Sequence, residues 1–97
     1  MYTLAEILCI LNNKEMLEDR AAYSGNFSLI DSIIDAERIV KKAGLTERQE
    51  ILFNMYVRTD LTLAKVGEMV GITHQGVADS INQSKKKIQK VIEEEEV

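Results

Sequence analysis

Apolar residues recur at helical spacing along most of the chain, and we find no strand-like alternation of apolar and polar residues. The stripe of Leu4, Ile7, Leu8 and Leu11 predicts an amphipathic helix from about Thr3 to Arg20, with a weak point at Asn12-Asn13 where the helix could break. Tyr23 to Asn26 has the composition of a turn. The next helix is predicted from about Ser28 to Ala43, with a buried stripe made of Leu29, Ile30, Ile33, Ile34 and Val40.

Three further helices follow from local start and stop signals. Thr46 to Gln49 has the pattern of a capping box, with Thr46 at the N-cap, and Ile51, Leu52, Met55 and Tyr56 then form one helix face. Thr62 is a suitable cap for a helix from Leu63 to about Val70, and a last helix is expected from His74 to about Ile92. The predicted fold class is therefore all-α: a small bundle of about five helices.

Residues 63–82 have the spacing of a helix-turn-helix. Gly67 is a small residue where the second helix must cross closely, Gly71 allows a positive φ at the turn, and Thr73 can cap the second helix. The apolar residues expected to clamp the two helices are Val66, Val70, Ile72, Val77 and Ile81.

The last helix separates into two faces at 100° per residue. Val77, Ile81, Ser84 and Ile88 share the sector expected to face the core. Gln75, Asp79, Asn82 and Lys86 occupy the opposite sector, and His74, Ala78 and Lys85 flank them. Amides can read adenine and a carboxylate can accept from cytosine, so this outward face has the chemistry of base recognition in a major groove.

Charge is unevenly distributed along the chain. The net charge is −4, and the run Glu93–Glu96 alone supplies −4, so residues 1–92 are neutral. Residues 72–92 set four lysines against Asp79, which gives +3. A basic segment next to the predicted recognition helix favours a phosphate patch, and the acidic run is expected to be a solubilising end.

The composition argues against several classes of function. One cysteine and one histidine cannot form an internal disulfide or a His/Cys metal cage, so we expect a cytoplasmic protein without cofactor, metal or catalytic residues. Cys9 is expected to be a small apolar core residue. The longest apolar run, Ile7 to Leu11, is too short for a membrane span.

The segments Ala43-Gly-Leu-Thr-Glu-Arg-Gln-Glu-Ile-Leu-Phe-Asn-Met-Tyr-Val57 and Leu61-Thr-Leu-Ala-Lys-Val-Gly-Glu-Met-Val-Gly-Ile-Thr-His-Gln-Gly-Val-Ala-Asp-Ser-Ile81 resemble sigma-70 region 4. The resemblance is closest to region-4-like regulators of phages and mobile elements of Gram-positive bacteria, and it covers about residues 28–90. It implies a sequence-specific DNA-binding transcription regulator whose recognition helix, residues 74–90, enters the major groove. Double-stranded DNA is then the expected partner, and RNA polymerase is a candidate partner.

The same resemblance assigns residues to the two kinds of DNA contact. The residues that would face base edges are Thr73, His74, Gln75, Asp79 and Asn82. Thr62 and Arg48 would meet backbone phosphate. Lys65, Lys85 and Lys86 are further phosphate candidates, the last two because phosphates are normally met toward the C-terminal half of the recognition helix. The chain lacks the arginine that the family often has at the start of the last helix, which favours weak binding by a single copy.

The sequence predicts three segments and leaves two alternative functions open. We expect an N-terminal helical arm at 1–27 that is a candidate for dimerisation, the region-4-like domain at 28–92, and an acidic tail at 93–97. A homodimer is expected because helix-turn-helix proteins commonly bind paired half-sites. The alternatives are a protein-interaction module of the same fold that engages RNA polymerase, and the DNA-binding small subunit of a phage terminase, which would form a ring.

Overall fold

The computed structural model describes residues 2–95, and within this range every regular element is a helix. The six helices are α1 (Leu4–Asn12), α2 (Lys14–Ser24), α3 (Phe27–Lys42), α4 (Glu47–Val57), α5 (Leu63–Val70) and α6 (His74–Glu95). The predicted all-α class is confirmed. None of the described helices is both long and apolar enough to cross a membrane.

The expected count of five helices was one too low because the predicted first helix is two helices. It breaks at the weak point in the sequence: α1 ends at Asn12, and Asn13 leaves helical geometry with φ −108° and ψ 20°. The Asn13 side chain donates 2.8 Å to the carbonyl of Cys9, which also accepts from the Asn13 backbone amide at 3.1 Å. Asn13 then accepts the first bond of α2, from the Leu17 amide at 2.9 Å.

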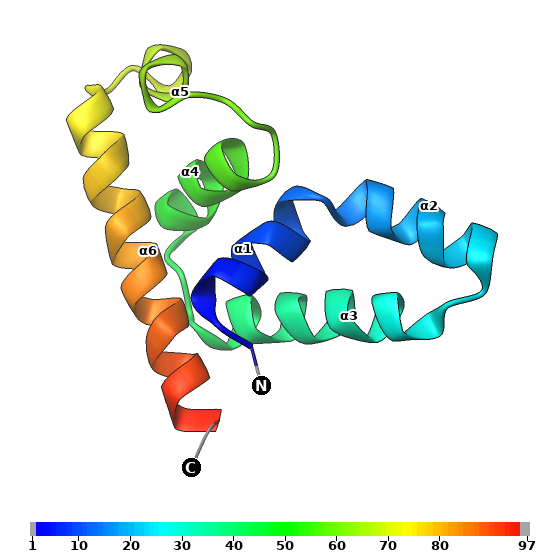
Figure 1. Ribbon diagram of the computed structural model, residues 1–97. Coiled ribbons are helices and arrows are strands. Elements are labelled where there is room, and N and C mark those ends of the chain that lie inside the picture. The colour runs from blue at the N-terminus through cyan, green and yellow to red at the C-terminus, as the bar shows by residue number, and fades with distance from the viewer. Residues whose placement is uncertain (1, 96–97) are drawn as a thin grey trace.

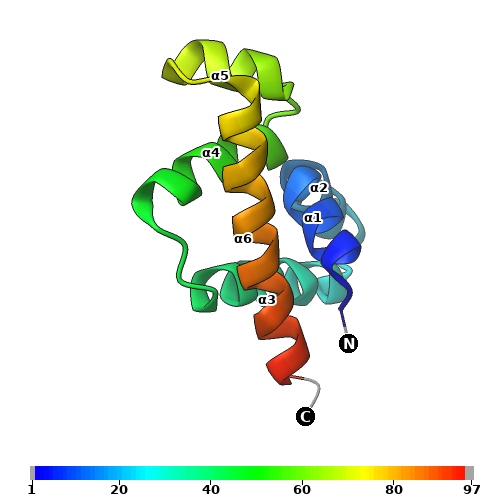
Figure 2. The ribbon, with the colours of Figure 1, turned by 90° about the vertical axis from the view of Figure 1, so that its left-hand side faces the viewer.

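The helices form two arms at an angle, as Figure 1 shows. One arm is the antiparallel hairpin of α2 and α3, and α1 lies beside the end of α3 that is nearer to the rest of the molecule. The other arm contains α4 and α5, with α6 running along the whole side of the molecule from α5 to the C-terminal end (Figure 2). This places α6 in contact with α1, α3, α4 and α5.

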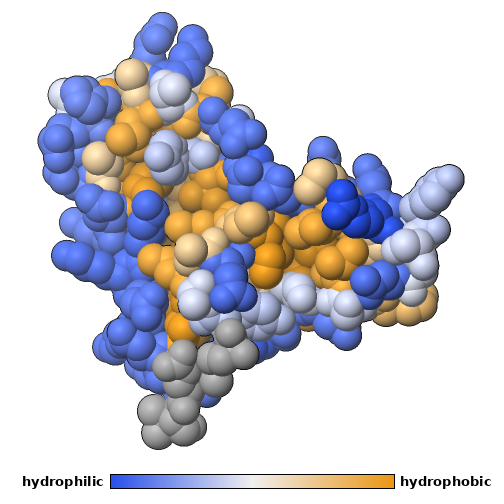
Figure 3. Space-filling view, in the orientation of Figure 1, coloured by the Kyte–Doolittle hydropathy of each residue, from blue (hydrophilic) through white to orange (hydrophobic). Residues whose placement is uncertain are grey.

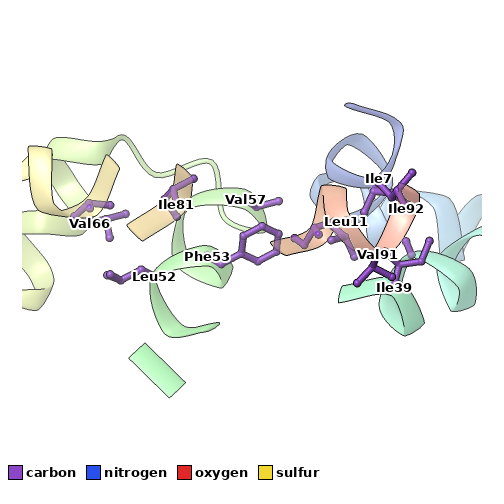
Figure 4. Packing of buried hydrophobic residues seen from close by; sticks show 13 residues of the cluster. Ile7, Leu11, Ile39, Leu52, Phe53, Val57, Val66, Ile81, Val91 and Ile92 are labelled. Atoms are coloured by element: carbon purple, nitrogen blue, oxygen red, sulfur yellow. The ribbon is translucent and has the colours of Figure 1, made fainter. Parts of the chain in front are cut away.

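One continuous apolar core joins the two arms. Its buried residues are Ile7, Leu11, Ala36, Ile39, Leu52, Phe53, Val57, Val66, Val77, Ile81, Ile88, Val91 and Ile92. Figure 4 shows Phe53 between the group around Val66 and Ile81 and the group around Leu11, Ile39 and Val91. Ser84 is the buried polar residue of α6, and its hydroxyl is satisfied by donating 3.1 Å to the carbonyl of Ser80.

Three predicted core residues lie at the surface instead. Ile34 is 57% exposed, since the buried face of α3 is made by Ile33, Ala36 and Ile39, which lie roughly 100–160° around the helix from it. Val70, the last residue of α5, is exposed beside the turn. Cys9 is also exposed, so the expectation of a core cysteine was wrong.

Ion pairs reinforce the junction of the arms. Arg58, which follows α4, donates to both carboxylate oxygens of Glu37 on α3 at 2.7 and 2.9 Å, and Lys14 of α2 lies 3.5 Å from the same carboxylate. The hydrogen bonds from Arg58 lower the pKa of Glu37, and the charge of Lys14 adds to the effect. A second group pairs Glu95, at the end of α6, with Arg38 and Lys42 of α3, and the bond from Arg38 lowers the pKa of Glu95.

The predicted acidic tail is in part an extension of the last helix. Glu93, Glu94 and Glu95 belong to α6, whereas the tail residues 96 and 97 lie outside the described residues. Because Glu95 pairs with α3, at least one tail carboxylate takes part in the packing of the fold.

Candidate nucleic-acid interface

Helices α5 and α6 and the turn between them have the backbone geometry of a helix-turn-helix. The side chain of Thr62 caps α5 by accepting from the Lys65 amide at 3.1 Å. Gly71 has φ +83°, and the amides of Gly71 and Ile72 both donate to the carbonyl of Gly67, at 2.8 and 2.9 Å. The Thr73 hydroxyl then accepts from the Gly76 amide at 3.0 Å and starts α6. Each predicted cap is confirmed.

Gly67 allows the turn to fold back onto α5. A Cβ at this position would lie 2.6 Å from the carbonyl oxygen of Ile72 and 3.3 Å from the amide nitrogen of His74. Both neighbours belong to the backbone, so no rotation of a side chain could make room. The close approach predicted for this residue is therefore confirmed.

Apolar side chains on the core-facing sides of α5 and α6 hold the two helices together. Val66 of α5 and Val77 and Ile81 of α6 are buried, and Ile72 of the turn is half-buried. The predicted inward sector of α6 is confirmed over its full length, since Ser84 and Ile88 are buried as well. The orientation of α6 is thus set by the core, which leaves its other side exposed.

The outward side of α6 is the predicted base-reading face. Figure 2 shows α6 in front of the other helices, and Figure 3 shows hydrophilic side chains along the edge where α6 lies. The five predicted base-reading residues are all exposed: Thr73, His74, Gln75, Asp79 and Asn82. The Gln75 amide donates 3.0 Å to the Asp79 carboxylate, so these two side chains are neighbours one helical turn apart. Thr73 is already occupied as the cap of α6, and any base contact would be additional to that bond.

The predicted phosphate-binding residues come from three elements. Thr62 and Lys65 lie at the start of α5, and Lys65 is 3.9 Å from Glu68. Arg48 is exposed on α4. On α6, Lys86 is exposed, and Lys85 is half-buried and lines the same surface hollow as Thr62. That these residues contact the phosphates of the DNA backbone is a prediction.

Lys87, the last lysine of the run Lys85-Lys86-Lys87, has a structural role. Lys87 is half-buried and donates 2.7 Å to the side-chain oxygen of Gln49, which also accepts from the Thr46 amide in the capping box. The Gln49 amide nitrogen in turn donates 3.2 Å to Gln83. This network ties the start of α4 to the middle of α6, so Lys87 takes part in the packing of the fold.

One lysine of the basic segment was not assigned a DNA contact from the sequence. Lys90 is exposed, and at 100° per residue it falls in the sector of Gln75, Asp79, Asn82 and Lys86. The spacing alone could have identified it. Glu93 falls in the same sector one turn later, so the basic part of this face ends with Lys90.

A left-handed glycine turn between two clamped helices, with an exposed polar face on the second, defines a helix-turn-helix protein. The chain belongs to the UPF0122 family, described as "Putative helix-turn-helix protein, YlxM / p13 like", whose match spans residues 38–96, more than half of the chain. Comparison with curated proteins and with solved structures gave no significant match. The family match confirms the helix-turn-helix part of the sequence interpretation.

Proposed function

We propose that the protein is a non-enzymatic, sequence-specific DNA-binding transcription regulator that presents α6 to the major groove. The observation that supports this most strongly is the exposed row of Gln75, Asp79 and Asn82 on α6. The opposite face of this helix is buried in the core, which fixes its orientation. Side chains on a rigid helix can keep the spacing that base edges require. The cytoplasmic location and the link to phages or mobile elements remain predictions.

The proposal makes different predictions for the two kinds of contact. Selection of bound DNA from a random pool at low salt should yield a preferred site. Gln75→Ala should reduce the preference for that site about tenfold, because a base contact contributes roughly 1–3 kcal/mol of discrimination. Lys86→Ala should weaken binding to all sequences alike and reduce the salt slope by about 1.

A matched control removes the same charge elsewhere. Lys41→Ala changes an exposed lysine on α3, outside the recognition helix, and should leave both the preference and the salt slope unchanged. Failure of the wild-type protein to bind any DNA at low salt would refute the proposed function.

A contact with another protein is the second candidate function. It is favoured by the exposed apolar residues Ile51, Met69 and Val70 on α4 and α5, two of which line a surface hollow with Arg48. RNA polymerase is the candidate partner. Co-purification with polymerase that is unaffected by Gln75→Ala and Lys86→Ala would favour this function over DNA reading.

We also propose that two copies associate through the α2–α3 hairpin. The apolar stripe of α1 is not free to form a dimer interface, because Ile7 and Leu11 are buried within the subunit. Helix α2 contacts only α1 and α3 within the described residues and buries a single residue, Ala21. At the end of the hairpin, Tyr23 is 96% exposed and Phe27 is 75% exposed.

The charges of the hairpin suit a second copy of the same chain. Arg20 on α2 and Asp31 on α3 form no ion pair within residues 2–95, and they lie about equally far from the Gly25 turn. We propose a two-fold axis that places each Arg20 near the partner's Asp31 while the aromatic ends cover one another. A paired site on DNA would then be read by two copies of α6.

Replacing both Tyr23 and Phe27 by serine should convert the dimer to a monomer in sedimentation equilibrium, because it removes the two most exposed aromatic side chains. Ile51→Ser, an exposed apolar residue on α4, is the control and should leave the dimer intact. A wild-type protein that is monomeric at every concentration measured would disprove association through this surface.

A further inference from the structure

The asparagine at the end of α1 makes two contacts with the segment that leads into α5. The side-chain nitrogen of Asn12 donates 2.6 Å to the carbonyl of Val57 and 2.7 Å to the carboxylate of Asp60. Both partners lie more than forty residues away in the sequence. The side-chain amide has two protons, so both of its donor positions are used.

The first of these bonds caps α4 from another helix. Val57 is the last residue of α4, and its carbonyl is one of the groups that a helix leaves without an internal partner. The chain then has only four residues, 58–61, before Thr62 caps α5. A restraint at Val57 and Asp60 therefore acts where a very short connection begins and again at its third residue.

The second bond holds a strained residue in place. Asp60 has φ +57°, and among the described residues it is the one non-glycine residue with a positive φ. This conformation is unfavourable for a residue with a Cβ, and it persists where the surroundings enforce it. The bond from Asn12 to the Asp60 carboxylate is such a contact. The hollow beside it is lined by Thr62 and Lys85, two of the predicted phosphate contacts.

We propose that Asn12 is a positioning residue for DNA binding, acting through Asp60 on the start of α5. This inference rests on the proposed function. Helix α5 packs only on α4 and α6 within the described chain, and the connection 58–61 joins it to α4, so this connection helps to restrain where Thr62 and Lys65 lie relative to the row on α6. The N-terminal helix, which contains no predicted DNA contact, would thus determine the spacing between phosphate and base contacts.

The test compares three variants of the complete chain. In Asn12→Ala and in Asp60→Gly the restraint is lost, and Kd for the selected DNA site should rise about tenfold with a salt slope lower by about 1, as for one lost phosphate contact. Asp60→Asn keeps an oxygen acceptor and a residue that tolerates positive φ, so it should bind as the wild type does.

Asp60→Gly separates positioning from a merely structural role. Glycine relieves the backbone strain at φ +57°, so Tm should change little while DNA binding weakens. If Asn12 only stabilised the fold, Kd measured well below Tm would be unchanged in Asn12→Ala and Asp60→Gly, and this result would overturn the proposal.

A second readout does not depend on DNA. Amide hydrogen exchange over residues 61–66 should be faster in Asn12→Ala and Asp60→Gly than in the wild type and in Asp60→Asn. If the wild type binds no DNA, the proposed function fails, while the exchange data still show whether the restraint exists. Unchanged exchange in both weakened variants would refute the restraint whatever the binding data show.

Discussion

Replacing Gly67 by alanine is expected to lower the free energy of unfolding by about 3 kcal/mol and to abolish DNA binding. The added Cβ would lie 2.6 Å from the backbone oxygen of Ile72, so the turn or α6 has to move. That movement would shift Gln75 and Asn82 relative to Thr62. Urea denaturation gives the stability, and a binding assay with the selected DNA site gives the affinity.

The control for this prediction is another glycine of the same motif. An alanine Cβ at Gly76 would lie 3.3 Å from the Thr73 hydroxyl and 3.7 Å from the side chain of Ile72, both of which are side-chain atoms. Alanine also has a higher helix propensity than glycine, so Gly76→Ala should change stability by no more than about 1 kcal/mol. Equal losses in the two variants would show that the close approach at Gly67 is not the cause.

The features that the sequence predicted correctly depend on neighbouring residues. The capping box at Thr46, the cap at Thr62 and the turn at Gly71 each need only a few consecutive side chains and a suitable φ. The exposed row on α6 follows from helical periodicity once the buried face is known. Most of the candidate site could therefore be located without coordinates.

The features that the sequence missed depend on distant packing. Whether Ile34 or Ile39 is buried depends on which face of α3 meets α1 and α6. Both residues are isoleucines, so the sequence allows a buried face that contains either one. Lys87 was grouped with its lysine neighbours because its acceptor, Gln49, is 38 residues away. The bonds from Asn12 to Val57 and Asp60 were hidden for the same reason.

Phe53→Ala is expected to cost about 3–5 kcal/mol, a large part of the total stability of a small domain. Phe53 is fully buried, and Figure 4 shows it between the side chains of the helix-turn-helix and those of α1, α3 and the end of α6. Ile51→Ala, a half-exposed residue on the same helix, should cost less than about 1 kcal/mol. Urea denaturation followed by circular dichroism measures both changes.

The same variant tests the predicted division between an arm at 1–27 and a domain at 28–92. Because Ile7 and Leu11 share one core with Ile39, Phe53 and Ile92, the cavity left by alanine should weaken both arms of the molecule together. Hydrogen exchange should then show equal losses of protection in α1 and in the buried part of α6. Protection that falls only in α5 and α6 would mean that residues 1–27 fold independently of Phe53, and the continuous core would not act as one cooperative unit.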